Sequence, residues 1–152
     1  MDGINILIQT RKLIVKAVEN LPTEAYFKIP DGFDNNLAWN IGHIIFVQQF
    51  FYYGLTGNEL LTPQIFPLMF RPGTSPADWE QQPDMPQLIS MLASHPERLQ
   101  AEYASGKLAK FNPYVTVTGV ALATIEEAIA FNNFHEGLHA GTMLSLRNFL
   151  GA

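Results

Sequence analysis

Near residue 140 the chain reads Asn133-Phe134-His135-Glu136-Gly137-Leu138-His139, which sets two histidines four residues apart. Side chains with this spacing lie on one face of an α-helix, so the segment predicts a helix that presents two imidazoles side by side. Such a helix can supply a divalent metal ion with two of its ligands. We therefore expect a helical protein with a metal site in which this helix takes part.

The same segment fits the zinc-peptidase pattern H-E-x-x-H, in which the glutamate acts as a general base. Only residues 140–152 follow His139, which is short for the downstream segment that usually supplies the third ligand of such enzymes. The extended form of the pattern also fails, because its glycine and third histidine are replaced by Thr142 and Ser145. We therefore expect the third ligand to come from upstream.

His43 is the upstream candidate, and it lies in the apolar, helix-like run Leu37–Val47. In a helix, Trp39 and Val47 would lie one turn on either side of His43, and Phe50 two turns further on, so the imidazole would project into hydrocarbon. Alone, such a histidine is most often a core residue that bonds a carbonyl group. The downstream pair of histidines favours a ligand instead.

The fourth histidine, His95, precedes Pro96. A proline disfavours helical geometry in the residue before it, so the pair predicts a bend. We expect His95 to be a surface residue outside the site.

Composition limits the possible classes of protein. The 152 residues are 47% hydrophobic and only 15% charged, whereas about 25% is usual. A single domain spanning residues 1–152 is expected, with some apolar surface covered in a homodimer. Uncharged polar residues covering that surface in a monomer are the alternative. The net charge is −5 with scattered basic residues, so we expect no nucleic-acid partner.

Cysteine is absent, which excludes a disulfide framework, a thiolate ligand from the chain and a cysteine nucleophile. Any metal ion would therefore be bound by nitrogen and oxygen atoms. The N-terminal residues lack the pattern of a signal peptide, and polar residues interrupt the apolar run Leu37–Leu55. We expect a cytoplasmic protein with no membrane partner.

Periodicity, capping residues and breakers predict four helices: Ile4–Leu21, a helix from about Asn36 to Tyr53, Asp84–Tyr103 with a kink at Pro96, and Ile125–Leu150. The residues Tyr26–Phe33 read as a connection, and Phe111–Leu122 as an extended segment. Five prolines make Leu61–Asp84 a long crossover without regular helix. The predicted fold is all-α, an antiparallel four-helix bundle with the crossover between its second and third helices.

Two segments carry a resemblance to a known family: Trp39-Asn40-Ile41-Gly42-His43 and Phe134-His135-Glu136-Gly137-Leu138-His139-Ala140-Gly141. With the proline-rich crossover between them, the chain resembles the DinB-like (DinB/YfiT-like) metal-binding four-helix bundles. The resemblance implies that His43, His135 and His139 bind the metal, with water completing its sphere. The chain departs from the pattern at Ala140, where many relatives carry a polar or basic residue, which leaves a contact behind the ligands in doubt.

Three neutral imidazoles leave a metal its full charge and an open position, where a bound water is acidified toward a pKa of about 7. The available chemistry is delivery of hydroxide or activation of a thiolate. Relatives of the resembled family include S-transferases that use low-molecular-weight thiols such as bacillithiol, and a mycothiol-dependent isomerase. We therefore predict a thiol S-transferase dependent on zinc, nickel or iron, acting on a small-molecule substrate. The alternative is a metal-binding or stress-associated protein without turnover.

Several neighbours of the histidines could support such a site. Trp39, Val47 and Phe50 are the predicted pocket walls. Asn132 and Thr142 could orient water or substrate, or could make ordinary hydrogen bonds within the bundle. Glu136 is displaced by about 100° from His135 around the helix. It could reach a bound water, hold an imidazole in place, or lie on a solvated face.

Overall fold

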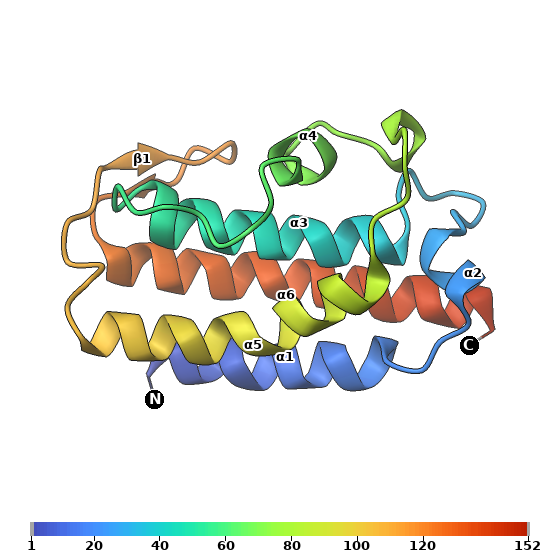
Figure 1. Ribbon diagram of the computed structural model, residues 1–152, viewed down its shortest axis with the longest axis horizontal. Coiled ribbons are helices and arrows are strands. Elements are labelled where there is room, and N and C mark those ends of the chain that lie inside the picture. Colours follow the sequence, from blue (N-terminus) through green and yellow to red (C-terminus); the bar gives the residue numbers. More distant parts are fainter. Residues whose placement is uncertain (1, 152) are drawn as a thin grey trace.

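The computed structural model describes residues 2–151. Four long helices run side by side, as Figure 1 shows: α1 (Gly3–Val18), α3 (Leu37–Gln49), α5 (Met85–Ala104) and α6 (Ile125–Leu150). Both α1 and α3 pack against both α5 and α6. The predicted all-α four-helix bundle is confirmed. Within residues 2–151, no helix is long and apolar enough to cross a membrane.

Side-chain caps fix where the helices begin. The carboxylate of Asp84 accepts a hydrogen bond from the backbone amide of Gln87 at 3.0 Å, and the Thr124 hydroxyl accepts one from the amide of Glu127 at 3.3 Å. Each cap satisfies an amide that has no partner within the helix. The predicted starts of these two helices, at Asp84 and Ile125, agree with the structure, in which Asp84 is the cap of α5 and Ile125 is the first residue of α6.

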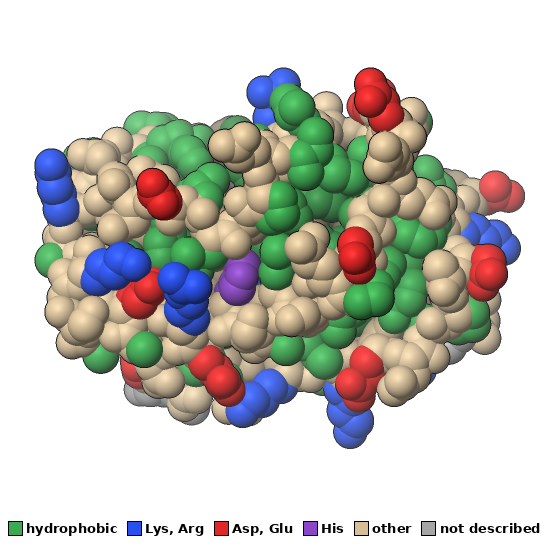
Figure 2. All heavy atoms as spheres, viewed as in Figure 1, with side chains coloured by type: hydrophobic (Ala, Val, Ile, Leu, Met, Phe, Trp, Pro, Cys, Tyr) green, Lys and Arg blue, Asp and Glu red, His purple; other side chains and the backbone are tan. Residues whose placement is uncertain are grey.

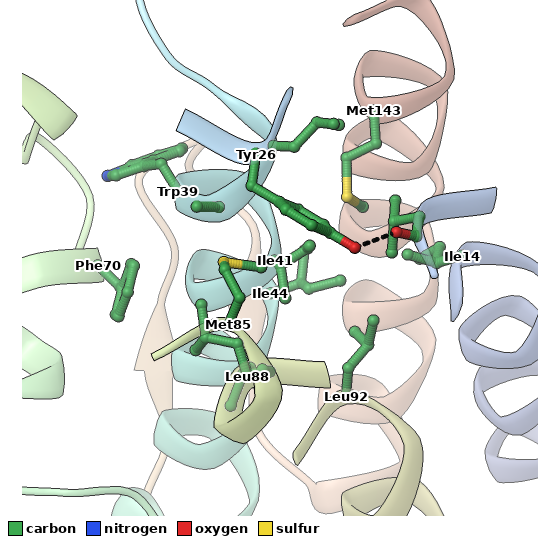
Figure 3. Close-up of a cluster of buried hydrophobic side chains, with 14 of the residues drawn as sticks. Ile14, Tyr26, Trp39, Ile41, Ile44, Phe70, Met85, Leu88, Leu92 and Met143 are labelled. Atoms are coloured by element: carbon green, nitrogen blue, oxygen red, sulfur yellow. Dashed lines mark hydrogen bonds between the residues drawn. The ribbon is translucent and has the colours of Figure 1, made fainter. Parts of the chain in front are cut away.

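The first predicted connection contains a helix. The chain leaves α1 at Val18, three residues before the predicted end, and Asn20 adopts a positive φ of 64°. A short helix, α2 (Thr23–Phe27), follows, and the hydroxyl of Tyr26 donates a hydrogen bond to the Val18 carbonyl at 2.5 Å. This contact holds α2 against the end of α1 (Figure 3).

The crossover also contains helical turns, so the prediction that it has none was wrong. It carries α4 (Phe66–Phe70) and the 3-10 turn η2 (Pro76–Asp78). Pro67 and Pro76 stand in the first turn of these elements, where the amide that proline lacks would have no helical partner. Figure 2 shows apolar side chains reaching the surface over this part of the molecule, where Ile65 and Leu68 are exposed.

The core at one end of the bundle joins all four long helices and the crossover (Figure 3). Its side chains are apolar and almost fully buried; they include Ile14, Trp39, Ile41, Ile44, Phe70, Met85, Leu88, Leu92 and Met143. Phe70 brings α4 onto α3 at Gly42. A Cβ atom at Gly42 would lie 2.3 Å from the Phe70 ring, so only glycine permits this contact.

At the other end, α3 continues into a π-helical turn, η1 (Phe50–Gly54), that the sequence did not predict. A hairpin of β1 (Tyr114–Val115) and β2 (Ala121–Leu122) lies over it, which confirms the predicted extended segment. The rings of Phe50 and Tyr114 meet edge to face, with centroids 5.2 Å apart. The hairpin thus packs on the end of α3.

Helix α5 continues through Pro96 and bends near its middle, as predicted (Figure 1). His95 is only 7% exposed, so the prediction of a surface residue was wrong. Position 95 shares the inward face of α5 with Leu92 and Leu99, and its Nδ1 atom lies 3.3 Å from the side-chain nitrogen of Gln49. The helical spacing of these residues outweighs the bend at the proline.

Candidate metal site

Three histidines from two adjacent helices converge in the middle of the bundle. His43 comes from α3, and His135 and His139 come from α6. One ring nitrogen of each lies within 4.8 Å of the others, and the ring centroids are 4.6–5.1 Å apart. The spacing of His135 and His139 and the packing of α3 on α6 bring together the three residues that the sequence singled out.

A backbone carbonyl fixes the proton of His43. Its Nδ1 atom lies 2.7 Å from the carbonyl oxygen of Phe70. A carbonyl oxygen can only accept, so Nδ1 donates and Nε2 keeps its lone pair. Gly42 makes this contact possible, because it lets the Phe70 ring lie directly on α3. The Gly-His pair therefore works as a unit.

The side chain of Asn40 fixes the proton of His139 on Nδ1. The Nδ1 atom of His139 lies 2.8 Å from Oδ1 of Asn40. The amide of Asn40 is oriented by its own donated bonds, to Oδ1 of Asn35 at 2.7 Å and to the carbonyl of Asn36 at 2.8 Å. His139 therefore also presents the lone pair of Nε2. Hydrogen bonds of this kind orient metal-binding histidines.

The geometry of the third histidine fits a cation. Nε2 of His135 lies 3.2 Å from Nε2 of His43, and its buried Nδ1 has no hydrogen-bond partner within residues 2–151. Two nitrogens bound to one zinc ion at about 2.0–2.1 Å in tetrahedral geometry lie about 3.3 Å apart. The two atoms are therefore already at the separation that a shared ion requires.

All three imidazoles are held neutral. Burial is the largest cause, and it lowers the pKa of His135 to about 3 and that of His139 to about 4, with the neighbouring histidines lowering both further. Burial also lowers the pKa of His43, against the opposing effect of the Phe70 carbonyl. Neutral imidazole is the form that binds metal ions, so no proton must be removed near pH 7.

Trp39 lies against the ligand face of α3. Its indole stacks on the His43 ring, with centroids 4.5 Å apart and planes inclined by 12°. The indole nitrogen donates a hydrogen bond to the hydroxyl of Thr74 at 3.0 Å. Trp39 therefore packs against His43 and links the crossover to the site.

Glu136 is not on a solvated face: it is 0% exposed. Its two carboxylate oxygens accept hydrogen bonds from Nε and Nη2 of Arg11, at 2.5 and 2.6 Å, and Arg11 is itself 1% exposed. Nη2 also donates to the Ile44 carbonyl at 3.0 Å and to Gln48 at 3.1 Å. This ion pair joins α1, α3 and α6 next to the histidines, and both oxygens of Glu136 are engaged in it.

Sequence reasoning missed Arg11, although a signal exists. Arg11 occupies an apolar position of α1, in helical register with Leu7, Ile14 and Val18. A cation at a core position needs a buried anion. That requirement could have directed attention to Glu136, the acidic residue between the two α6 histidines.

The other two polar candidates bond within their own helix. The amide of Asn132 donates to Glu136 at 3.0 Å, which places Asn132 in the buried ion-pair network. Thr142 is half-buried and donates to the Leu138 carbonyl at 3.1 Å. Neither hydrogen bond reaches a histidine.

A cavity of about 230 Å³ adjoins His135. Two of the three predicted wall residues, Val47 and Phe50, line it together with residues of the β-hairpin and of α6. Trp39 is not among the lining residues, because it packs on His43 instead. The site thus has an apolar space on one side and a buried ion pair on the other.

Comparison with known proteins places the chain in a family. Residues 6–143 match the family model of the DinB superfamily, and this range contains all three histidines. No curated protein matches the chain.

Proposed function

Because the chain belongs to the DinB superfamily, we propose that His43, His135 and His139 bind a divalent zinc, nickel or iron ion and that the protein is a thiol S-transferase. The observation that carries the proposal is the convergence of three neutral imidazoles whose ring nitrogens lie within 4.8 Å of one another. Three nitrogen ligands leave room for an exogenous ligand in a metal sphere, which is the arrangement of catalytic rather than structural sites.

The roles of the chain's own residues follow from their contacts. Phe70 and Asn40 accept the Nδ1 protons of His43 and His139, which directs both Nε2 lone pairs inward. Trp39 covers His43, and the Arg11–Glu136 pair fixes α6 against α1 and α3. These residues hold the imidazoles in position before any ligand binds.

The sulfur must come from outside, because the chain contains no cysteine. When bound, a metal ion supplies positive charge that favours the thiolate form of a ligand thiol. In the proposed transfer a C–S bond forms while the bond from that carbon to its leaving group breaks. The leaving group departs with the electron pair, and the thiol proton passes to solvent.

The test is a panel of low-molecular-weight thiols with small electrophiles, applied to protein purified without chelators or immobilised nickel. We expect transfer faster than with free metal ion, and loss of both metal and activity in His135→Ala. His95→Gln is the matched control, since it changes a buried histidine outside the triad. Bound metal without transfer would instead favour a metal-binding or stress-associated protein, and absence of metal would contradict both functions.

We also propose a cytoplasmic homodimer. Leu13 of α1 and Leu144 of α6 are 56% and 40% exposed and border the same shallow depression between these helices, which a second subunit could cover. Low-molecular-weight thiols are kept reduced in the cytoplasm. A monomer at micromolar concentration in sedimentation would refute the dimer.

A further inference from the structure

Several aromatic side chains line the cavity beside His135. Phe50 and Phe51 come from η1, Phe131 and Phe134 from α6, and Tyr114 from the β-hairpin. The rings of Phe51 and Phe131 meet edge to face, with centroids 5.8 Å apart. Rings in this arrangement form a rigid apolar surface against which a flat ring can pack.

The volume indicates how much of a ligand the cavity can cover. The cavity measures about 230 Å³. An apolar cavity of about 150 Å³ is enough for benzene, whereas drug-sized ligands occupy about 300 Å³ or more. The space therefore suits one ring with a short substituent.

The charge of the lining residues indicates which substituent on the ring the cavity favours. Arg71 is the only charged side chain among the described residues that line the cavity. It is exposed, and within residues 2–151 it forms no ion pair with a carboxylate. Arg71 also directly follows Phe70, whose carbonyl accepts a hydrogen bond from His43. The backbone therefore holds Arg71 close to the histidine triad. A guanidinium matches the planar, bidentate geometry of a carboxylate.

We propose that this cavity binds a small monocyclic aromatic carboxylate, with the ring against the phenylalanines and the carboxylate on Arg71. Such a molecule would lie next to His135, where a reacting thiolate is needed. As the electrophile of the S-transferase, such a molecule would also carry a leaving group, which departs with the electron pair as the C–S bond forms at the carbon that held it. This assignment rests on the proposed function, whereas binding of the carboxylate does not.

The test is binding without any thiol, measured by NMR titration of the full-length protein. Phenylacetate carries both ring and charge, phenylacetamide lacks the charge, and acetate lacks the ring. We expect phenylacetate to bind more tightly than either. Equal affinity for phenylacetate and phenylacetamide would overturn the role of Arg71, and equal affinity for phenylacetate and acetate would overturn the role of the aromatic walls.

Variants locate the binding. Arg71→Gln should weaken phenylacetate about fivefold, as expected for one exposed ion pair, and leave phenylacetamide unchanged. Lys28→Gln removes the same charge at the end of α2, at the opposite end of the bundle from the hairpin (Figure 1), and should change neither affinity. Val117 lines the cavity and is 84% exposed, so Val117→Asp should fold and should repel phenylacetate selectively. Unchanged binding in both Arg71→Gln and Val117→Asp would place phenylacetate elsewhere and overturn the proposal.

The two proposals fail in different ways. If phenylacetate binds through Arg71 but no thiol is transferred to any electrophile, the cavity assignment stands and the S-transferase function fails. If thiol is transferred to neutral electrophiles while phenylacetate does not bind, only the present inference fails.

Discussion

The adjacent residues His135 and Glu136 of α6 belong to two different polar clusters, the histidine triad and the Arg11–Glu136 ion pair. Glu136 turns toward α1 and meets Arg11, so the charges of this pair are matched. His135 turns toward α3 and meets His43, where two ring nitrogens face each other 3.2 Å apart. A matched pair fixes the helices, whereas a set of converging lone pairs offers a place for a cation. Within one H-E-x-x-H segment, the glutamate therefore stabilises the packing of the helices, while the histidines are available to bind a ligand.

The Arg11–Glu136 pair should contribute more to the free energy of unfolding than the contacts of the histidine triad do. In Glu136→Gln, Arg11 would stay buried without its counter-charge, which costs about 3–5 kcal/mol of the free energy of unfolding. Urea denaturation measures the loss. Glu126→Gln, on the exposed start of the same helix, is the control and should change stability little. A loss below about 1 kcal/mol for Glu136→Gln would show that the pair does not fix the bundle.

The metal affinity of the histidine triad should depend on the contacts that orient its imidazoles. In Gly42→Ala the new Cβ would clash with the Phe70 ring, at a cost of about 1–3 kcal/mol. Displacing Phe70 would also move its carbonyl from His43, so metal affinity should fall about 10–100-fold. Gly141→Ala on α6 has open space around its Cβ and should bind metal normally. Equal affinities of the two variants, measured by competition with a chromogenic chelator, would contradict this role of Gly42.

A substitution at Asn40 should have a smaller effect on the histidine triad. Asn40→Leu removes the oxygen that accepts from His139, and metal affinity should fall about tenfold, the lower end of such effects. The free energy of unfolding should fall less than in Glu136→Gln. If Asn40→Leu unfolds the protein as readily as Glu136→Gln, the division between the two clusters is wrong.

The sequence predicts the histidine triad better than it predicts the Arg11–Glu136 pair, and the reasons are physical. Helical spacing brings His135 and His139 together, and the apolar run around His43 indicates the helix that meets them. Neither pattern indicates which backbone carbonyl will reach His43, because that depends on how α4 packs on Gly42. Spacing alone also leaves open which acidic residue Arg11 will meet. His95 was misplaced because the proline outweighed the register with Leu92 and Leu99.

The cavity was predicted only in part, for a related reason. Val47 and Phe50 could be placed from the register of α3. Most of the remaining walls come from α6, the hairpin and Arg71, and their positions follow from tertiary packing over η1. Local pattern could indicate that the hairpin segment is extended, but not where it packs.

A further prediction concerns the pH dependence of stability. Burial lowers the pKa of His135 to about 3 and of His139 to about 4, below the value of about 6.5 in an unfolded chain. Between these values the unfolded chain binds more protons, so stability rises with pH. The metal-free protein should therefore lose stability as the pH falls from about 6.5 toward 4. The double variant His135→Asn, His139→Asn should lose less over this window, and an equal loss in chemical denaturation would contradict the assignment.

X-ray absorption at the zinc edge tests the central claim most directly. Zinc-loaded protein should show three imidazole nitrogens at about 2.0–2.1 Å, and saturation with a low-molecular-weight thiol should add one sulfur at about 2.3 Å. His135→Ala should reduce the number of imidazoles. A zinc sphere without imidazole, or one unchanged by thiol, would contradict the account.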